Sequence, residues 1–369
     1  MLKVLQLLGR MDCGGAETML MNIYRHIDKE QVSFDFLVCD EGKGYYDDEI
    51  RTLGGEIFYI GSQGKLGLPR YIRELKSFLH KNKYDIVHSH LDWQGGAIAY
   101  ADYKAGVKRR IVHAHTCSSN RKSLLFQGVL NLEKYWINRY ATDFWACSNK
   151  AASYLFNKRN NIQIIPNAFD LEKYLNPDKD IVDSIKKQVN AKEDTIIIGH
   201  IGNFSTIKNQ KYLVELSRIL SVKKVDHRLL FVGDDCTEYG QETKELVQKY
   251  SLQDYIYFLG LKDDIYNLVN VFDVFCFPSL HEGLGIVAVE AQAAGVPCIV
   301  SDGVAGEVDM GLSLVANVDL ENPEKWADKI LDCKSKKLND KRRIGRALES
   351  KKFKIETNIK FIEKLYLQK

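Results

Sequence analysis

Two glutamates eight positions apart, in the segment EGLGIVAVE from Glu282 to Glu290, are well suited to bind a polar, charged substrate. The segment follows an apolar run, FDVFCFPSL, and opens a pattern typical of a helix. Gly283, Leu284 and Gly285 would offer backbone N–H groups at the helix N-terminus, where partial positive charge favours anions. A carboxylate accepts paired hydrogen bonds from vicinal hydroxyl groups. The segment therefore predicts a nucleotide-sugar site, and an ordinary strand–turn–helix corner is the alternative.

Histidines alternate at the ends of two near-copies, DIVHSH and RIVHAH, which finish at His90 and His115. Residues two apart share one face of a strand, so each pair points to one side. An H-x-H pair can bind zinc, but neither pair has a third-ligand pattern around it, and no metal site is predicted. Substrate contact and burial with hydrogen bonds are the two interpretations; burial is favoured for His88 and His90.

Two further segments could face an anion. In GRMDCGGAE, Gly14 and Gly15 permit a tight turn between the first strand and first helix, although a full G-x-G-x-x-G fingerprint is absent. In HIGNFSTIKNQ, Lys208 could place a compact positive charge against a diphosphate, and Asn209 could cap a helix. A simple turn and a surface lysine are the alternatives.

Composition excludes several classes of protein. The chain has 369 residues, which exceeds one comfortable core and predicts two domains. A net charge of +3 argues against a nucleic-acid binder. The sequence contains no run of about eighteen apolar residues, so we expect no membrane span. The eight cysteines are scattered without CxxC pairs, which fits a reducing cytosol, so we expect a cytoplasmic protein.

Strand-like apolar runs alternate with helical patterns along the chain, which predicts parallel α/β sheets. We place a first domain at residues 1–175, a polar linker at 176–194 and a second domain at 195–352. A lysine- and arginine-rich tail begins at about Ser335, and its last part, residues 353–369, has apolar residues at helical spacing. Strands are expected at 3–8, 33–38, 56–60, 86–88, 110–113, 144–147, 163–165, 195–201, 228–232, 256–259, 274–278, 298–301 and 312–316, and helices at 16–27 and 68–81.

The segment from Glu282 to Glu290 resembles the E-x7-E signature of retaining glycosyltransferases with the GT-B fold, in particular glycosyltransferase family 4. Pro278-Ser279 before it and EAQAAGVPCIVSD at its end also match, and the likeness reaches from near the N-terminus to about Asp319. The resemblance implies an α/β GT-B protein with two Rossmann-like, doubly wound domains that face a central cleft. It also implies that the last helix packs back onto the first domain.

The resemblance carries roles to matching residues. Glu290 would bind the donor ribose, and Glu282 would contact the sugar or its phosphates, beside the backbone of the glycine-rich turn. The Gly14-Gly15 loop would approach the donor phosphate or the acceptor. His115 matches the histidine that hydrogen-bonds the donor sugar and supports the transition state.

The loop that contains Lys208 departs from the family pattern at one position. The family has Gly-Arg where this chain has Gly202-Asn203. Asparagine keeps a donor but loses the charge and the bidentate fork of arginine. Lys208 is therefore expected to be the principal cation facing the leaving diphosphate, with Asn203 as a substrate-binding neighbour.

The implied activity is that of a retaining, metal-independent glycosyltransferase. It would move a sugar from a nucleotide-diphosphate donor, expected to be UDP-linked, to a hydroxyl of a saccharide or lipid-linked saccharide during capsule, exopolysaccharide or lipopolysaccharide assembly. No cofactor is expected. One alternative is a catalytically weak or inactive glycosyltransferase-like subunit that binds a partner or nucleotide-sugar. The other is a nucleotide-sugar epimerase of GT-B architecture.

A last segment, residues 118–145, combines apolar residues with Arg121, Lys122, Lys134 and Arg139. Helices that lie on membrane surfaces show this mixture, and core packing is the alternative. If the acceptor is lipid-linked, we expect this stretch to make peripheral contact with anionic lipid on the inner face of the cell membrane.

Overall fold

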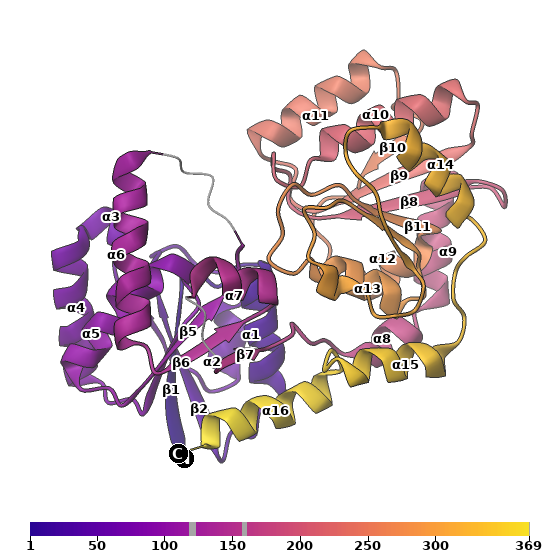
Figure 1. The fold of residues 1–369 in the computed structure, drawn as a ribbon. Helices are drawn as coiled ribbons and strands as arrows, with labels where there is room; N and C mark the ends of the chain where they lie inside the picture. The colour runs from indigo at the N-terminus through magenta and orange to yellow at the C-terminus, as the bar shows by residue number, and fades with distance from the viewer. Residues whose placement is uncertain (118–122, 157–160, 369) are drawn as a thin grey trace. The chain divides into compact units, whose positions relative to one another are not determined.

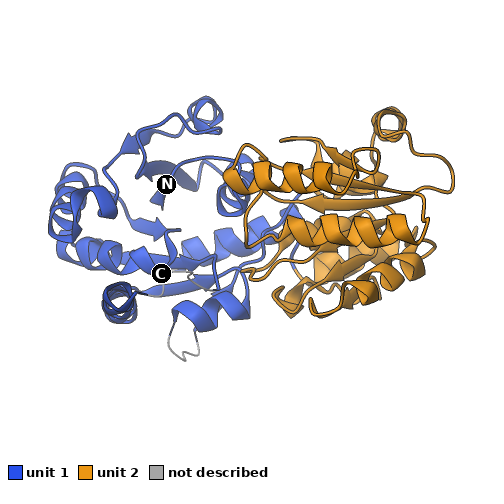
Figure 2. Ribbon diagram, turned by 90° about the horizontal axis from the view of Figure 1, so that it is seen from above, with its two compact units in different colours: residues 1–169, 352–369 blue, residues 170–351 orange. Residues whose placement is uncertain are grey.

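The computed structural model describes residues 1–117, 123–156 and 161–368 (Figure 1). The chain forms two compact units, coloured separately in Figure 2. The first unit comprises residues 1–169 and 352–369, and the second comprises residues 170–351. Each unit contains one sheet whose paired strands are all parallel, with helices in the connections between strands, so the predicted α/β class is confirmed.

The sheet of the first unit has the strand order β3-β2-β1-β4-β5-β6-β7. The chain moves outward from β1 in one direction and then returns to the other side of β1, which is the doubly wound pattern. In β1, five of seven residues are buried, as expected for a parallel strand covered on both faces. The strands are β1 Leu2–Leu8, β2 Val32–Val38, β3 Ile57–Tyr59, β4 Ile86–Ser89, β5 Arg109–Ala114, β6 Asp143–Ala146 and β7 Ile162–Ile164.

Helices of the first unit bury one face against this sheet. The C-terminal helix α16 packs beside α1 and contributes Ile359, Ile362 and Tyr366 to a core that also contains Tyr24 and Phe34. The helices are α1 Gly15–His26, α2 Asp47–Thr52, α3 Gln63–Leu66, α4 Leu68–Lys81, α5 Gly95–Ala105, α6 Leu124–Tyr140, α7 Asn149–Leu155, α16 Ile355–Leu367 and the 3-10 turn η1 Asp92–Gln94.

The second unit repeats the same winding with the strand order β10-β9-β8-β11-β12-β13. Its strands are β8 Ile196–Ile201, β9 His227–Val232, β10 Ile256–Phe258, β11 Val274–Phe277, β12 Cys298–Val300 and β13 Val315–Asn317. Its helices are α8 Leu171–Leu175, α9 Lys179–Gln188, α10 Gln210–Val222, α11 Glu238–Lys249, α12 Ile265–Val271, α13 Ile286–Ala293, α14 Pro323–Cys333, α15 Lys341–Ser350 and the 3-10 turn η2 Gly306–Val308.

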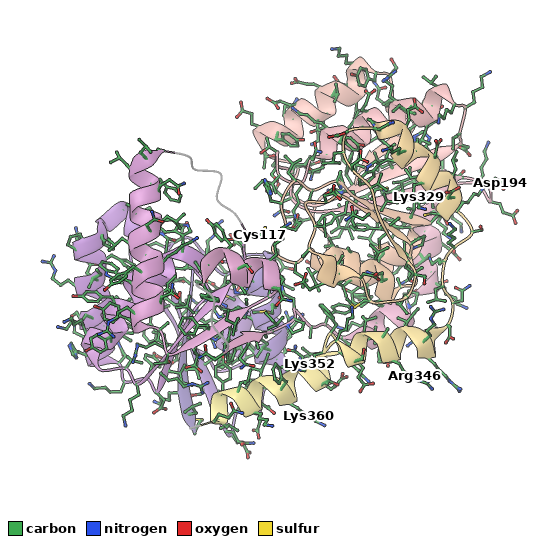
Figure 3. All side chains as sticks on the ribbon, in the orientation of Figure 1. Cys117, Asp194, Lys329, Arg346, Lys352 and Lys360 are labelled. Carbon is green, nitrogen blue, oxygen red and sulfur yellow. The ribbon has the colours of Figure 1, made fainter. Side chains whose placement is uncertain are left out.

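The last two long helices are amphipathic. In α15, Ile344 and Leu348 are buried, whereas Arg346 points away from the ribbon (Figure 3). Lys360 in α16 is exposed in the same way. The basic composition of this part of the sequence therefore places charge on outward helix faces, while the apolar residues form core. Among the described residues, no helix is both long and apolar enough to cross a membrane.

The unit boundaries differ from the expected domain limits. The first unit ends at Phe169, whereas we expected residue 175, because α8 belongs to the second unit. The expected linker at 176–194 also lies in the second unit and contains α9, which packs beside α12. The backbone N–H of Asp178 donates to Asn267 Oδ1 at 2.9 Å. No residue of α9 is buried, which accounts for the polar composition that led us to expect a linker here.

Burial within α16 yields a testable contrast. Ile362 is completely buried, so Ile362→Ala should lower the free energy of unfolding by roughly 2–5 kcal/mol, through lost transfer energy and a residual cavity. Lys360→Ala, two residues earlier on the exposed face, should change it by less than about 0.5 kcal/mol. Urea unfolding followed by circular dichroism measures both. Equal effects of the two substitutions would contradict the packing of α16 described above.

Candidate functional site

The strand order of the second unit creates a switch point between β8 and β11. The chain leaves these neighbouring strands toward opposite faces of the sheet, and in open α/β sheets ligands bind beyond the carboxyl ends at such a point. The loop after β8 carries Asn203 and Lys208, and the loop after β11 carries Glu282 to Gly285. The topology thus brings together two segments that the sequence separates by more than seventy residues.

Lys208 and Glu282 form an ion pair in which Lys208 Nζ lies 2.7 Å from Glu282 Oε1. The side chain of Lys208 is 26% exposed and that of Glu282 is 12% exposed. Lys208 Nζ also lies 5.0 Å from the centre of the Phe277 ring, at the end of β11. The backbone N–H of Leu280 donates to the carbonyl of Ile207 at 2.8 Å, which ties the two loops together. The cation is therefore held in place beside a carboxylate.

Asn203 is held by the neighbouring loop. Its Oδ1 accepts a hydrogen bond from the backbone N–H of Asp234, just after β9, at 3.0 Å. In addition, Gln210 Nε2 donates to the carbonyls of Gly202 and Asn203, at 3.2 and 3.3 Å. The side chain at this position therefore joins two loops, which is a structural contact that the sequence did not predict.

The glycine-rich turn places the start of α13 after Gly285, which is the N-cap and has φ 89°. Only glycine adopts this conformation without strain, and a Cβ atom there would lie 3.0 Å from the Phe277 ring. Leu284 is 4% exposed, so its side chain is core. The helix thus begins directly after the glycine-rich turn, and in its first turn the backbone N–H of Ala288 donates to the carbonyl of Gly285 at 3.0 Å.

Glu290 lies in the second turn of α13, and its Oε1 accepts a hydrogen bond from the Tyr174 hydroxyl at 2.5 Å. Burial raises the pKa of Glu290, and the hydrogen bond from Tyr174 opposes this rise. Nothing in the sequence indicated Tyr174 as a neighbour of this glutamate, since 116 positions separate the two residues. The tyrosine engages one carboxylate oxygen directly and orients the side chain.

In the first unit, the Gly14-Gly15 turn leads into α1, with Gly14 as the N-cap. A carboxylate oxygen of Glu17 lies beside Gly14, and burial raises the pKa of Glu17. Asn167 Nδ2 donates to the carbonyl of Gly15 at 3.3 Å, so the segment after β7 holds the turn from the other side. Glu17 belongs to the GGAE motif that the sequence displayed, whereas Asn167 had no sequence signal.

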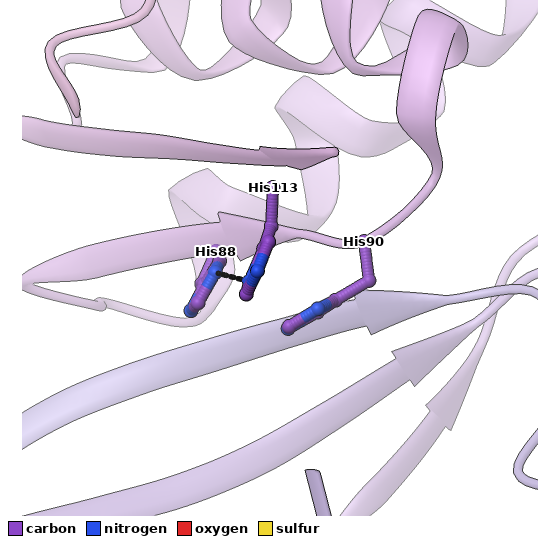
Figure 4. Close-up of side chains that lie close together, drawn as sticks. All are labelled: His88, His90 and His113. Carbon is purple, nitrogen blue, oxygen red and sulfur yellow. Dashed lines mark hydrogen bonds between the residues drawn. The ribbon is translucent and has the colours of Figure 1, made fainter. Parts of the chain in front are cut away.

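His115 comes directly after β5 and belongs to a group of four imidazoles, which we call the histidine cluster: His88, His90, His113 and His115. His88 Nε2 lies 3.3 Å from His113 Nδ1, the contact marked in Figure 4, and His90 Nδ1 lies 3.0 Å from His115 Nε2. The backbone N–H of His115 donates to Asp92 Oδ1 at 2.7 Å. The alternating histidines therefore meet across two neighbouring strands.

Burial sets the charge of this cluster. It lowers the pKa of His115 to about 4 and lowers those of His88, His90 and His113 well below the usual value. All four imidazoles are consequently neutral at pH 7. Burial also raises the pKa of Asp92 to about 6, which its hydrogen bonds from the backbone oppose.

Within the part of the chain that the structure describes, two groups of side chains are close enough together to hold a metal ion. One is His88, His90 and His113, whose candidate ligand atoms lie within 4.8 Å of one another. Nitrogens of His88 and His90 are already hydrogen-bonded, to Tyr366 at 2.6 Å and to Gln6 at 2.9 Å respectively. These contacts suit a hydrogen-bonded network better than a metal centre, for which nitrogen lone pairs must converge.

The other group is Asp234, Asp235 and Cys236. Asp234 Oδ1 accepts from the Cys236 backbone N–H at 3.0 Å, and Asp235 pairs with Lys244 at 2.9 Å. Both carboxylates therefore already stabilise their own loop and the following helix α11.

Comparison with known proteins places this architecture in a family. Residues 13–173 match the family model "Glycosyltransferase Family 4", and residues 182–351 match "Glycosyl transferases group 1". The chain is 38% identical to the putative glycosyltransferase EpsF of Bacillus subtilis over 343 residues, which cover 89% of this chain and 86% of that protein. It is 27% identical to the capsular polysaccharide biosynthesis glycosyltransferase CapH of Staphylococcus aureus, over 100% of this chain and 99% of CapH.

Among solved structures, the fold is similar to that of Anabaena HepE in complex with UDP-glucose. The TM-score is 0.80 with 20% sequence identity, over 99% of each chain. At this level of identity the likeness establishes the shared fold.

The contact between the loops after β8 and β9 leads to a prediction. Gly233 has φ 140°, and a Cβ atom there would lie 2.4 Å from the carbonyl oxygen of Gly202. Gly233→Ala should therefore lower the free energy of unfolding by roughly 2 kcal/mol or more. Gly306→Ala is the control, because no atom lies within 4 Å of a Cβ at that exposed position. Thermal unfolding compares the two; equal melting temperatures would contradict the close approach of these loops.

Proposed function

Because this chain belongs to glycosyltransferase family 4 and has the GT-B fold, we propose that it transfers a sugar from a UDP-sugar to a saccharide hydroxyl, with retention of configuration. The observation that carries the proposal is the Lys208–Glu282 pair at the switch point of the second sheet. The structure of HepE in complex with UDP-glucose supports UDP as the carrier, and the name of CapH supports polysaccharide assembly.

The donor would be held by contacts from both loops and from α13. Its diphosphate lies at the N-terminus of α13, near the backbone of Gly283 and Gly285, with Lys208 as the neighbouring cation. Glu290 accepts hydrogen bonds from the ribose hydroxyls, while Tyr174 holds its Oε1 in position. Lys208 leaves its pairing with Glu282 when the more highly charged diphosphate arrives.

In the chemical step, the bond between the anomeric carbon and the UDP oxygen breaks, and the acceptor oxygen bonds to that carbon on the same face. The acceptor proton passes to the departing phosphate oxygen, so no protein base is required. Negative charge develops on the diphosphate, and Lys208 with the first turn of α13 stabilises it. We propose that this positive charge replaces a metal ion, so activity should persist in the presence of EDTA.

Lys208 can be tested against a matched neighbour. Lys211, in the first turn of α10, also pairs with a glutamate, Glu242, at 2.5 Å. Lys208→Ala should reduce kcat for UDP release at least a hundredfold, the usual scale for loss of a group that stabilises transition-state charge. Lys211→Ala should stay within about twofold, because an exposed ion pair contributes little. The assay follows UDP release from a panel of UDP-sugars with membrane extract as acceptor.

Full turnover by Lys208→Ala would overturn the assignment of the cation. A wild-type protein that binds UDP in calorimetry but releases none from any donor would favour the second candidate, a binding subunit without turnover. The observation that favours this candidate is Asn203, whose Oδ1 is engaged by Asp234 where the family carries an arginine. Family membership supports neither an epimerase nor another reaction class.

The acceptor proposal rests on helix α6. Leu124 and Leu125 at its start are 90% and 88% exposed, and Val129, Leu132 and Tyr135 are also exposed. Leu130 and Ile137 on the other side are buried, so core packing accounts for only one face of the helix. We propose that the exposed face contacts a membrane that carries a lipid-linked saccharide acceptor.

Vesicle binding tests this face. The double substitution Leu124→Glu/Leu125→Glu should reduce co-sedimentation with vesicles of anionic phospholipid at least tenfold, because two apolar anchors become negatively charged. Val222→Glu is the control, since Val222 is 72% exposed at the end of α10, in the second unit. UDP release with a water-soluble saccharide acceptor should be unaffected by either change. Equal vesicle binding by all three proteins would refute the membrane contact.

A further inference from the structure

The histidine cluster is part of a longer chain of hydrogen bonds in the first unit. Gln6 lies in β1 and Tyr366 in α16, and both are buried. Gln6 Oε1 lies 2.9 Å from His90 Nε2, and Gln6 Nε2 donates to the Tyr366 hydroxyl at 3.1 Å. The continuous order is His113, His88, Tyr366, Gln6, His90, His115. The reaction proposed above assigns no role to Gln6, to Tyr366 or to His90.

The glutamine determines the direction of this chain. A side-chain amide has one end that only donates and one end that only accepts. Because Nε2 of Gln6 donates to Tyr366, its Oε1 must receive an N–H from His90 Nε2. A neutral imidazole carries a single N–H, so His90 Nδ1 is an acceptor. It receives its hydrogen bond from His115 Nε2, at 3.0 Å.

The other half of the network, from Gln6 through Tyr366 and His88 to His113, is consistent with this direction. The Tyr366 hydroxyl donates to His88 Nδ1 at 2.6 Å while its oxygen accepts from Gln6. His88 then donates from Nε2 to His113 Nδ1 at 3.3 Å. Gln6, Tyr366, His88 and His90 each use one donor and one acceptor, and none of these steps requires a charged imidazole. At the end of the network, His113 Nε2 has no hydrogen-bond partner among the described residues. The low pKa of each histidine, caused by burial, agrees with a neutral network.

We propose that Gln6, acting through His90, fixes His115 as the Nε2–H tautomer, so that its Nδ1 presents a lone pair to a hydroxyl group of the donor sugar. Among the described residues, Nδ1 of His115 has no hydrogen-bond partner. Gln6, His90 and Tyr366 are thus positioning residues. The inference rests on the proposed function and on the role that the family resemblance implies for His115, a hydrogen bond to the donor sugar.

This tautomer has a consequence for specificity. An acceptor nitrogen selects for a group that donates, and a site built around such a bond discriminates against analogues that lack the hydroxyl. His115 also acts as a neutral acceptor and not as an acid, because its proton is committed to His90. A donor sugar in which the contacted hydroxyl is replaced by hydrogen or fluorine should therefore be a poorer substrate.

Nitrogen NMR of the full chain, labelled with ¹⁵N-histidine, tests the tautomer without any substrate. Long-range proton–nitrogen spectra distinguish Nδ1–H from Nε2–H, and each signal is assigned by single substitution. The wild-type protein should show His115 as Nε2–H. Gln6→Met keeps the length of the side chain and removes both polar ends, so His115 should become a mixture of tautomers, and kcat/KM for the UDP-sugar should fall about tenfold.

A second variant and a control accompany this test. Tyr366→Phe removes the hydroxyl that accepts a hydrogen bond from Gln6 Nε2. The Gln6 amide is then no longer held in one orientation, so this variant should also produce a mixture of His115 tautomers. His113→Gln alters a fully buried histidine at the opposite end of the hydrogen-bond network and should leave His115 as Nε2–H.

Several outcomes separate the two proposals. An Nδ1–H tautomer of His115 in the wild-type protein overturns the inference, as does an unchanged tautomer in both Gln6→Met and Tyr366→Phe. One equivalent of zinc in the purified protein, with shifts at His88, His90 and His113, also overturns it. Absence of UDP release from every donor contradicts the proposed function instead. The NMR experiment uses no substrate, so its result does not depend on this assay.

Discussion

Parallel pairing of strands that are buried on both faces is the constraint on which both units depend. A parallel strand needs a helical crossover before its neighbour can pair with it, so the carboxyl ends of all strands meet at one edge of the sheet. Where the winding reverses, the two central loops are directed to opposite faces and leave a place for a ligand. The ion pair of Lys208 with Glu282 exists because β8 and β11 are neighbours at this reversal.

Polar groups in the first unit show how a buried site avoids the cost of burial. A polar side chain without a partner is expensive in the interior, and a charged one more so. Gln6, His90 and Tyr366 are almost fully buried, yet each has a hydrogen-bond partner, and the histidines stay neutral. Such a network is directional, since every neutral imidazole has one donor and one acceptor. Orientation of one amide can therefore decide which nitrogen His115 leaves open.

Regular elements were predictable from the sequence because local patterns carry them. Apolar runs of strand length located the strands within a few residues, with the largest difference at β13, observed at Val315–Asn317 where 312–316 was expected. Leu68–Lys81 was predicted with its observed limits, since its apolar residues repeat at helical spacing. The glycine-rich turn before α13 was visible because a positive φ at Gly285 requires glycine.

The sequence by itself determined the α/β class, the family, and the residue types at the ends of the strands: glutamates and lysine in the second unit, histidines in the first. Only the tertiary structure decided which residues are the hydrogen-bond partners of these side chains. Tyr174 meets Glu290, Asn203 meets Asp234, and Gln6 meets His90, each across a long stretch of chain. Hydrogen bonds between side chains depend on the register of distant elements, and no local periodicity encodes that register.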